Sequence, residues 1–156
     1  MIFITVGTQL PFPRLIQAMD ALAPDLGEEV FAQAGPEPGE VKNLDVLTHL
    51  APAEFEAKFR AARVVVAHAG IGTILSAKRF GKPLVLLPRR ADLGEHRNDH
   101  QLATARQVEK LPGVYIAWET GDLGPLLATR DLVPANQDMS ATHKALVARL
   151  KSFVAA

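Results

Sequence analysis

The chain has 156 residues, 48% hydrophobic and 22% charged, a composition typical of a globular domain that is large enough to bury a core. Lysine plus arginine and aspartate plus glutamate both total 17, so no overall positive charge favours a nucleic-acid partner. The absence of cysteine excludes disulfides, thiolate metal sites and a cysteine nucleophile.

Apolar runs alternate with amphipathic segments along the chain. The first run, 2–6, predicts a strand and is too short for a signal peptide, and no run approaches the ~20 apolar residues of a membrane span. We therefore expect a cytoplasmic protein with one domain, residues 1–156. Further strands are predicted at 29–34, 44–48, 64–67, 84–87 and 114–117. Helices are predicted at 13–26, 53–62, 73–80, 98–110 and 139–154.

Strands that lack alternating polar residues, separated by helices, are typical of a parallel sheet with helices on both faces. The sequence thus predicts an α/β, Rossmann-like fold. Ligands of such sheets bind beyond the carboxyl ends of the strands. We expect the loops 7–9, 68–73 and 88–101 to share that rim, because each follows a predicted strand.

The glycine turn His68-Ala69-Gly70-Ile71-Gly72-Thr73 joins a predicted strand to a helix that should begin at or just before Thr73. Such a turn directs backbone N–H groups and the positive end of the helix dipole at one point, which suits a phosphate. Gly70 and Gly72 carry no Cβ and would let a ligand approach the backbone closely. A short turn of this kind also often serves only as a connection, so the turn alone leaves both interpretations open.

The loop 88–101 is rich in charged and polar side chains, among them Arg89, Arg90 and Arg97. Arginine binds phosphate and carboxylate in a two-pronged manner, which favours a binding loop over a solvated surface loop. His96 and His100 lie four residues apart and could serve as acid or base, but no clear third ligand accompanies them, so no metal site is predicted. The P-loop, dinucleotide-binding and nucleophile-elbow motifs are missing from the sequence.

Three ordered motifs resemble one known family. They are Val6-Gly7-Thr8 with Phe12, Leu15 and Ile16 after it, His68 to Leu75 with Gly81-Lys82-Pro83-Leu84 after it, and Asn98-Asp99-His100-Gln101. Together they resemble the C-terminal, donor-binding domain of family 28 glycosyltransferases over almost the whole chain. The chain is most similar to small stand-alone members: the cytosolic subunit of the split dolichol-linked N-acetylglucosaminyltransferase and, in the loop 88–101, the bacterial exopolysaccharide-biosynthesis subunits.

The resemblance implies one half of a GT-B architecture that binds a UDP-sugar. In the family the glycine turn holds the diphosphate, here Gly70, Ile71, Gly72 and Thr73, and the first loop, here Gly7 and Thr8, closes on the donor. His100 and Gln101 match the motif whose glutamine contacts sugar hydroxyls. Many members carry a ribose-binding glutamate where this chain has Ser76. The resemblance then implies that ribose recognition is weaker, is mediated by water or comes from another part of the chain.

His68 has two interpretations, a histidine hydrogen-bonded to backbone at a strand end, or a catalytic residue that contacts the diphosphate and, when protonated, stabilises the leaving UDP. The arginines Arg89, Arg90 and Arg97 favour a carboxylated sugar such as glucuronate.

From the resemblance we expect the catalytic, donor-binding subunit of a two-component glycosyltransferase of polysaccharide biosynthesis, without metal or other cofactor. It would move a hexosyl or glucuronosyl group to a lipid-linked acceptor, with a membrane-anchored, acceptor-binding subunit as partner at the inner face of the membrane. The apolar side of the 139–154 helix is a candidate docking surface, or packs on its own domain. The alternatives are a non-catalytic regulatory subunit that binds the nucleotide sugar and a sugar-nucleotide epimerase.

Overall fold

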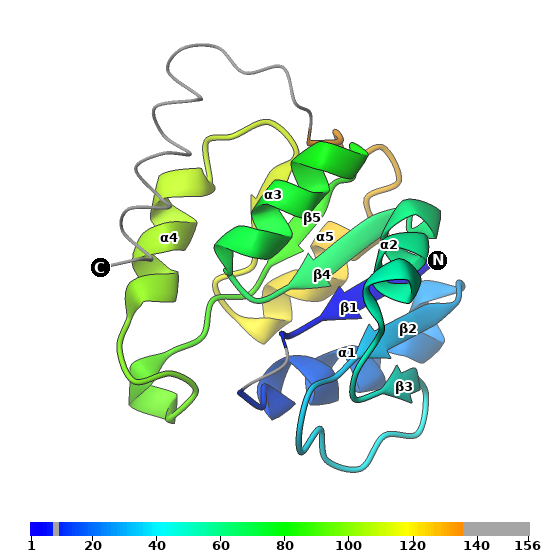
Figure 1. Ribbon diagram of the computed structural model, residues 1–156, viewed down its shortest axis with the longest axis horizontal. Coiled ribbons are helices and arrows are strands. Elements are labelled where there is room, and N and C mark those ends of the chain that lie inside the picture. The colour runs from blue at the N-terminus through cyan, green and yellow to red at the C-terminus, as the bar shows by residue number, and fades with distance from the viewer. Residues whose placement is uncertain (8–9, 136–156) are drawn as a thin grey trace.

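The computed structural model describes residues 1–7 and 10–135 around a sheet of six strands (Figure 1). The strand order is β3-β2-β1-β4-β5-β6, and every neighbouring pair is parallel. The strands are β1 (Ile2–Thr5), β2 (Val30–Gln33), β3 (Asp45–Leu47), β4 (Val64–Ala67), β5 (Leu84–Leu86) and β6 (Val114–Ile116). The α-helices are α1 (Pro13–Leu26), α2 (Pro52–Ala61), α3 (Ile71–Phe80), α4 (His100–Val108) and α5 (Leu123–Ala128), and short 3-10 helices span Ala91–Leu93 and Thr120–Asp122.

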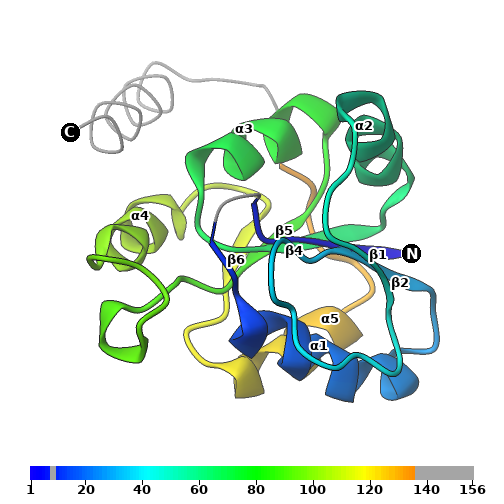
Figure 2. The ribbon, with the colours of Figure 1, turned by 60° about the horizontal axis from the view of Figure 1, so that its bottom comes forward.

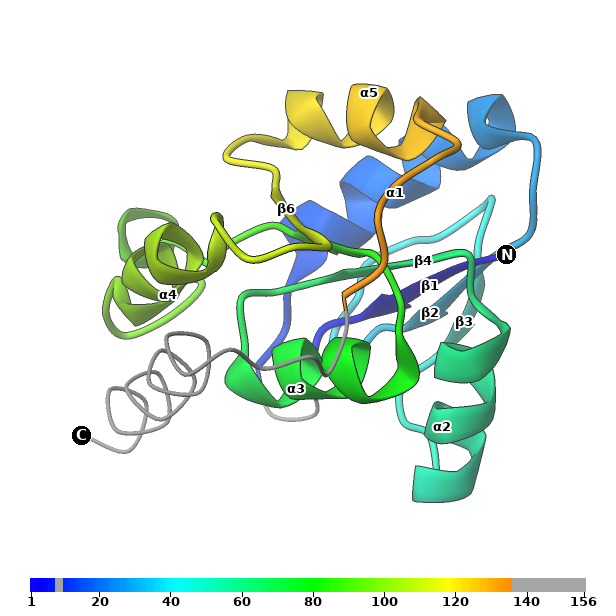
Figure 3. The same cartoon turned by 90° about the horizontal axis from the view of Figure 1, so that it is seen from above.

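Helices cover both faces of the sheet. Helices α1 and α5 lie on one face, and α2 and α3 lie on the other (Figures 2 and 3). Alternate residues of the inner strands belong to different cores: Ile4 belongs to the core with α1 and α5, whereas its neighbour Phe3 belongs to the core with α2, α3 and α4. Because both faces are buried, the strands are apolar at successive positions, which is the pattern from which the parallel sheet was predicted.

The predicted α/β fold with a parallel sheet is confirmed, and all six predicted strands are present. Helix α3 begins at Ile71, two residues before Thr73, since Gly70 is the last residue with extended backbone. Helix α4 begins at His100 rather than at residue 98, because Asp99 is its N-cap. The short helix α5, which contains a glycine and a proline, was not predicted. The predicted 139–154 helix and its candidate docking surface lie outside the described residues.

The order of the strands reverses between β1 and β4, which are neighbours in the sheet but are followed by helices on opposite faces. A crevice at the carboxyl ends of such a pair is the usual ligand site of an open parallel sheet. The first-strand loop and the glycine turn both leave the sheet there. Within residues 1–7 and 10–135 no helix is both long and apolar enough to span a bilayer.

Candidate functional site

The glycine turn places the N-terminus of α3 directly after β4. Gly70 caps this helix with extended backbone, and no side chain of residues 1–7 or 10–135 caps the helix end. The first N–H that bonds back is that of Ile74, to the Gly70 carbonyl (3.3 Å). The N–H groups of Ile71, Gly72 and Thr73 therefore have no acceptor within the helix. A Cβ on Gly72 would meet nothing within 4 Å. This end of α3 can bind an anion through backbone N–H groups and the helix dipole.

The His68 ring lies between two glycines, one from each loop of the crevice. A Cβ on Gly70 would come within 2.6 Å of the His68 Cε1 atom, and a Cβ on Gly7 within 3.4 Å of Nε2. Gly7 also has a φ of +80°, which disfavours other residues. The absence of side chains at Gly7 and Gly70 thus makes room for the imidazole, a packing role that the sequence interpretation did not include.

Gln101 determines the tautomer of this imidazole, that is, which ring nitrogen carries the proton of the neutral ring. Its side-chain oxygen accepts hydrogen bonds from the backbone N–H groups of Ala69 (3.2 Å) and Arg89 (3.0 Å), so its amide nitrogen faces His68 Nδ1 at 3.0 Å. An amide nitrogen can only donate, which makes Nδ1 the acceptor and leaves the proton of the neutral ring on Nε2. Gln101 is 8% exposed and here organises the turn; its predicted contact with sugar hydroxyls stays a prediction.

Electrostatics also favour a neutral His68. Burial, and then the positive charge of Arg89 and the His96 ring, lower the pKa of His68 to about 3. In the protein without ligand, His68 is therefore a neutral N–H donor at physiological pH. The protonated form that the sequence interpretation expected would form only when a bound anion raises this pKa.

Arg89 is buried, with 2% of its surface exposed, and its guanidinium donates hydrogen bonds to backbone carbonyls. Its two terminal nitrogens donate to the carbonyls of Val6 (2.7 Å), Leu10 (3.0 Å), Pro11 (2.7 Å) and Glu95 (3.4 Å). The guanidinium also lies 4.6 Å from the centroid of the Phe12 ring, a favourable cation–π contact. Arg89 thus ties the loop after β1 to the loop after β5. Its predicted contact with substrate stays a prediction.

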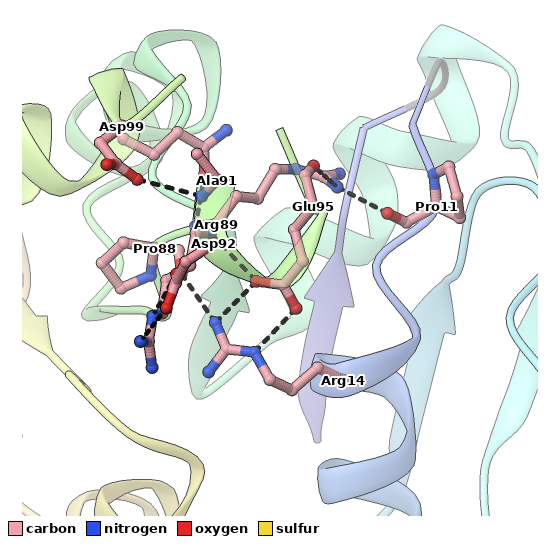
Figure 4. A network of polar contacts seen from close by, with 10 residues as sticks. Pro11, Arg14, Pro88, Arg89, Ala91, Asp92, Glu95 and Asp99 are labelled. Atoms are coloured by element: carbon pink, nitrogen blue, oxygen red, sulfur yellow. Dashed lines mark hydrogen bonds and ion pairs between the residues drawn. The ribbon is translucent and has the colours of Figure 1, made fainter. Parts of the chain in front are cut away.

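A second network holds the loop 88–101 against α1 (Figure 4). The Glu95 carboxylate accepts two bonds from Arg14 (2.8 and 2.9 Å) and one from the Arg90 backbone N–H (3.0 Å), and Arg14 also donates to the Pro88 carbonyl (3.0 Å). The Arg90 side chain instead pairs with Asp92 (2.6 Å). The polar loop is therefore fixed to the sheet's rim rather than extended into solvent.

Cavities open on both sides of the α3 N-terminus. One of about 520 Å³ lies between α2 and α3, and Gly7, Gly72, Thr73 and Ser76 are among the residues that line it. On the other side, a cavity of about 240 Å³ is lined by Gly7, His68, Arg89, His96 and Gln101, among others. A neighbouring cavity of about 200 Å³ is lined by residues that include Gly70, Ile71, Arg97, His100 and Gln101. The expected common rim of the three loops is thus present.

The structure brings most of the predicted site residues together around these cavities. Arg90 lines none of the three, and Thr8 lies outside the described residues. Arg97 lines a cavity, whereas Arg89 binds backbone carbonyls and Arg90 pairs with Asp92, so the case for a carboxylated sugar now depends on Arg97. Among the described residues, no three His, Asp or Glu side chains gather as a metal site would require.

Sequence reasoning missed Gln33, which is 3% exposed at the end of β2. Its amide oxygen accepts from the Thr5 hydroxyl (2.6 Å), and its amide nitrogen donates to the carbonyls of Gly7 (3.0 Å) and Thr48 (3.3 Å). Gln33 thus joins the ends of three strands beneath the larger cavity. The signal in the sequence was the single amide side chain, Gln33, in an otherwise apolar strand. A buried strand tolerates an amide only when the polar atoms of that side chain are hydrogen-bonded.

Solved structures confirm the fold. MurG of Acinetobacter baumannii is 19% identical to this chain with a TM-score of 0.64, and the match covers 96% of this chain and 49% of the MurG chain. ALG13 is 19% identical with a TM-score of 0.63, covering 94% of both chains. UDP-glucose:anthocyanidin 3-O-glucosyltransferase, in complex with UDP, is 14% identical to this chain with a TM-score of 0.61. That match covers 99% of this chain and 35% of the glucosyltransferase chain.

This chain therefore spans less than half the length of several glycosyltransferases that share its fold. The search of curated proteins gave no match. The family model of the glycosyltransferase family 28 C-terminal domain matches residues 1–123, from β1 to the start of α5, and so includes every strand and every loop of the site. The chain accordingly belongs to the glycosyltransferase family 28 C-terminal domain family.

Proposed function

We propose that this chain is the donor-binding, catalytic half of a two-component glycosyltransferase. It would transfer a hexosyl group from a UDP-sugar to a lipid-linked acceptor in polysaccharide biosynthesis. The observation that carries the proposal is the N-terminus of α3, which no described side chain caps and which has cavities on both of its sides. A nucleotide sugar has the same three-part form: a nucleoside, an anionic diphosphate and a sugar.

The diphosphate would bind the N–H groups of Ile71, Gly72 and Thr73, where the helix dipole favours negative charge. The nucleoside would enter the cavity of about 520 Å³, and the sugar the two smaller cavities, both of which Gln101 lines and one of which His68 lines. As the bond between sugar and phosphate breaks, charge develops on the leaving diphosphate. The Nε2–H group of His68 and the N–H groups of the turn would stabilise that charge.

Arg97 is the side chain that supports a carboxylated sugar, because a guanidinium pairs well with a carboxylate. We therefore propose, more specifically, that the transferred hexosyl group is glucuronosyl. It predicts tighter binding of UDP-glucuronate than of UDP-glucose, and equal affinity would remove its support.

The acceptor site, the membrane anchor and the general base would come from a partner subunit. In the proposed GT-B arrangement, donor and acceptor meet between two such domains, and this chain supplies one of them. We expect little sugar transfer by the purified chain and clear transfer when it is co-expressed with that partner. Robust transfer by the chain alone would contradict this division. Product formed without any acceptor would instead favour an epimerase, and binding without transfer a regulatory subunit.

Calorimetric titration with UDP tests the donor site itself. We expect binding, and we expect Gly72→Ala to weaken it by about tenfold, because the added methyl group would occupy the space in front of the α3 N-terminus at a cost of about 1.4 kcal/mol. The methyl group should not disturb the fold, since nothing lies within 4 Å of it.

Gly121→Ala is the matched control, because its Cβ would also meet nothing within 4 Å, and it lies in the 3-10 helix before α5, away from the cavities. It should bind UDP like the unaltered chain. Equal affinities of all three proteins would place the nucleotide elsewhere, and no UDP binding at all would overturn the donor site in this chain.

A further inference from the structure

The cavity between α2 and α3 has an apolar wall with one carboxylate on it. Leu50, Pro52, Phe55 and Phe80 supply apolar surface, which suits the flat face of a base. Among the described residues that line this cavity, Glu56 is the one acidic side chain. Its position on α2 places it across the cavity from α3, which contributes Gly72, Thr73 and Ser76.

Glu56 is held in place by a chain of contacts between α2 and α3. Arg60 donates two hydrogen bonds to the Glu56 Oε1 atom, at 3.0 and 2.9 Å. The Arg60 guanidinium in turn lies 4.7 Å from the centroid of the Phe80 ring, and Arg79 lies 4.9 Å from the same ring. Both bonds from Arg60 reach Oε1, and no residue within the described part of the chain donates to Oε2.

An exposed ion pair of this kind, between residues four apart on a helix, contributes little to stability. The Glu56 side chain keeps 40% of its surface exposed although it lines a cavity. What the arrangement provides is an oriented acceptor at the mouth of an apolar cavity. A carboxylate there can accept hydrogen bonds from two neighbouring hydroxyl groups at once.

Ser76 of α3 lines the same cavity as Glu56 of α2. We propose that Glu56 accepts hydrogen bonds from the ribose hydroxyls of the nucleotide and thereby determines the preference for ribose over deoxyribose. This inference rests on the proposed function, because it needs the diphosphate at the N-terminus of α3 and the nucleoside in the cavity beside it. Ribose recognition would thus come from α2 rather than from α3, which carries Ser76.

Titration with UDP and with 2′-deoxy-UDP tests this assignment. The unaltered chain should bind UDP about tenfold more tightly, the contribution expected of one hydrogen bond to a charged acceptor. Glu56→Gln should reduce that ratio to about threefold or less, because the acceptor loses its charge. Glu54→Gln is the matched control, since Glu54 lies on the same helix and lines none of the described cavities, and it should keep the full ratio.

A double variant tests the geometry. Ser76→Glu added to Glu56→Gln puts the carboxylate back on the other wall, and a restored preference for UDP supports recognition of the ribose in this cavity. If Glu56→Gln binds UDP and keeps the ratio of the unaltered chain, the assignment to Glu56 is overturned and the proposed donor site stands. If the unaltered chain binds neither nucleotide, both are overturned.

Discussion

Replacing Arg89 by methionine should lower the free energy of unfolding by about 3 kcal/mol, the cost typical of breaking a buried charged network. Methionine keeps much of the side-chain volume but offers no donors. The carbonyls of Val6, Leu10 and Pro11 would then lose a charged partner at a buried position. Burial lowers the pKa of Arg89 to about 10, with Glu95 opposing the shift, so the guanidinium is charged at neutral pH.

Urea denaturation followed by circular dichroism measures this effect. Arg90→Met is the matched control, because Arg90 is the next residue of the same loop and its side chain pairs with the exposed Asp92. That control should change stability by no more than about 0.5 kcal/mol, as is usual for a surface ion pair. Equal losses of unfolding free energy in the two variants would mean that the buried hydrogen bonds of Arg89 stabilise the protein no more than the exposed ion pair of Arg90 does.

The fold was predictable because the sheet is buried on both faces. Each of its strands consists mostly of apolar residues, and every residue of β1, β2, β4 and β5 is buried, as the uninterrupted runs required. Helix α1 has its predicted bounds, and Gly81 closes α3 with a φ of +65°, as predicted from the glycine and the proline that follow it. Helix α5 was missed, because it has six residues and depends on packing against α1 rather than on its own sequence pattern.

The sequence predicted where the site lies on the sheet, but it did not predict which side chains contact one another there. The glycine turn and the polar loop follow strands, so topology alone puts them on one rim. Which polar side chains face a ligand depends on backbone carbonyls far away in sequence, such as the carbonyl of Val6 that Arg89 contacts 83 residues away. The same limit applies to Gly70, where the sequence shows a missing side chain and only the structure shows the His68 ring beside it.

Acidification should destabilise the protein through His68. Its pKa is about 3 in the folded state and ordinarily 6.5, so the unfolded chain binds a proton first as the pH falls. The contribution of His68 is complete above about pH 6.5 and is lost progressively between there and pH 3. At 1.36 kcal/mol per pH unit, the free energy of unfolding should fall by about 2 kcal/mol between pH 7.5 and pH 5 from this group.

His68→Asn separates this contribution from that of other groups. The asparagine side-chain oxygen can take the place of Nδ1 and accept from Gln101, but it does not titrate in this range. Unfolding free energies measured at several pH values should therefore show a flatter profile in the variant than in the unaltered chain. Parallel profiles would mean that His68 takes up its proton in the folded protein as readily as in the unfolded chain. In that case the imidazolium, rather than the neutral ring, would face the anion at the N-terminus of α3.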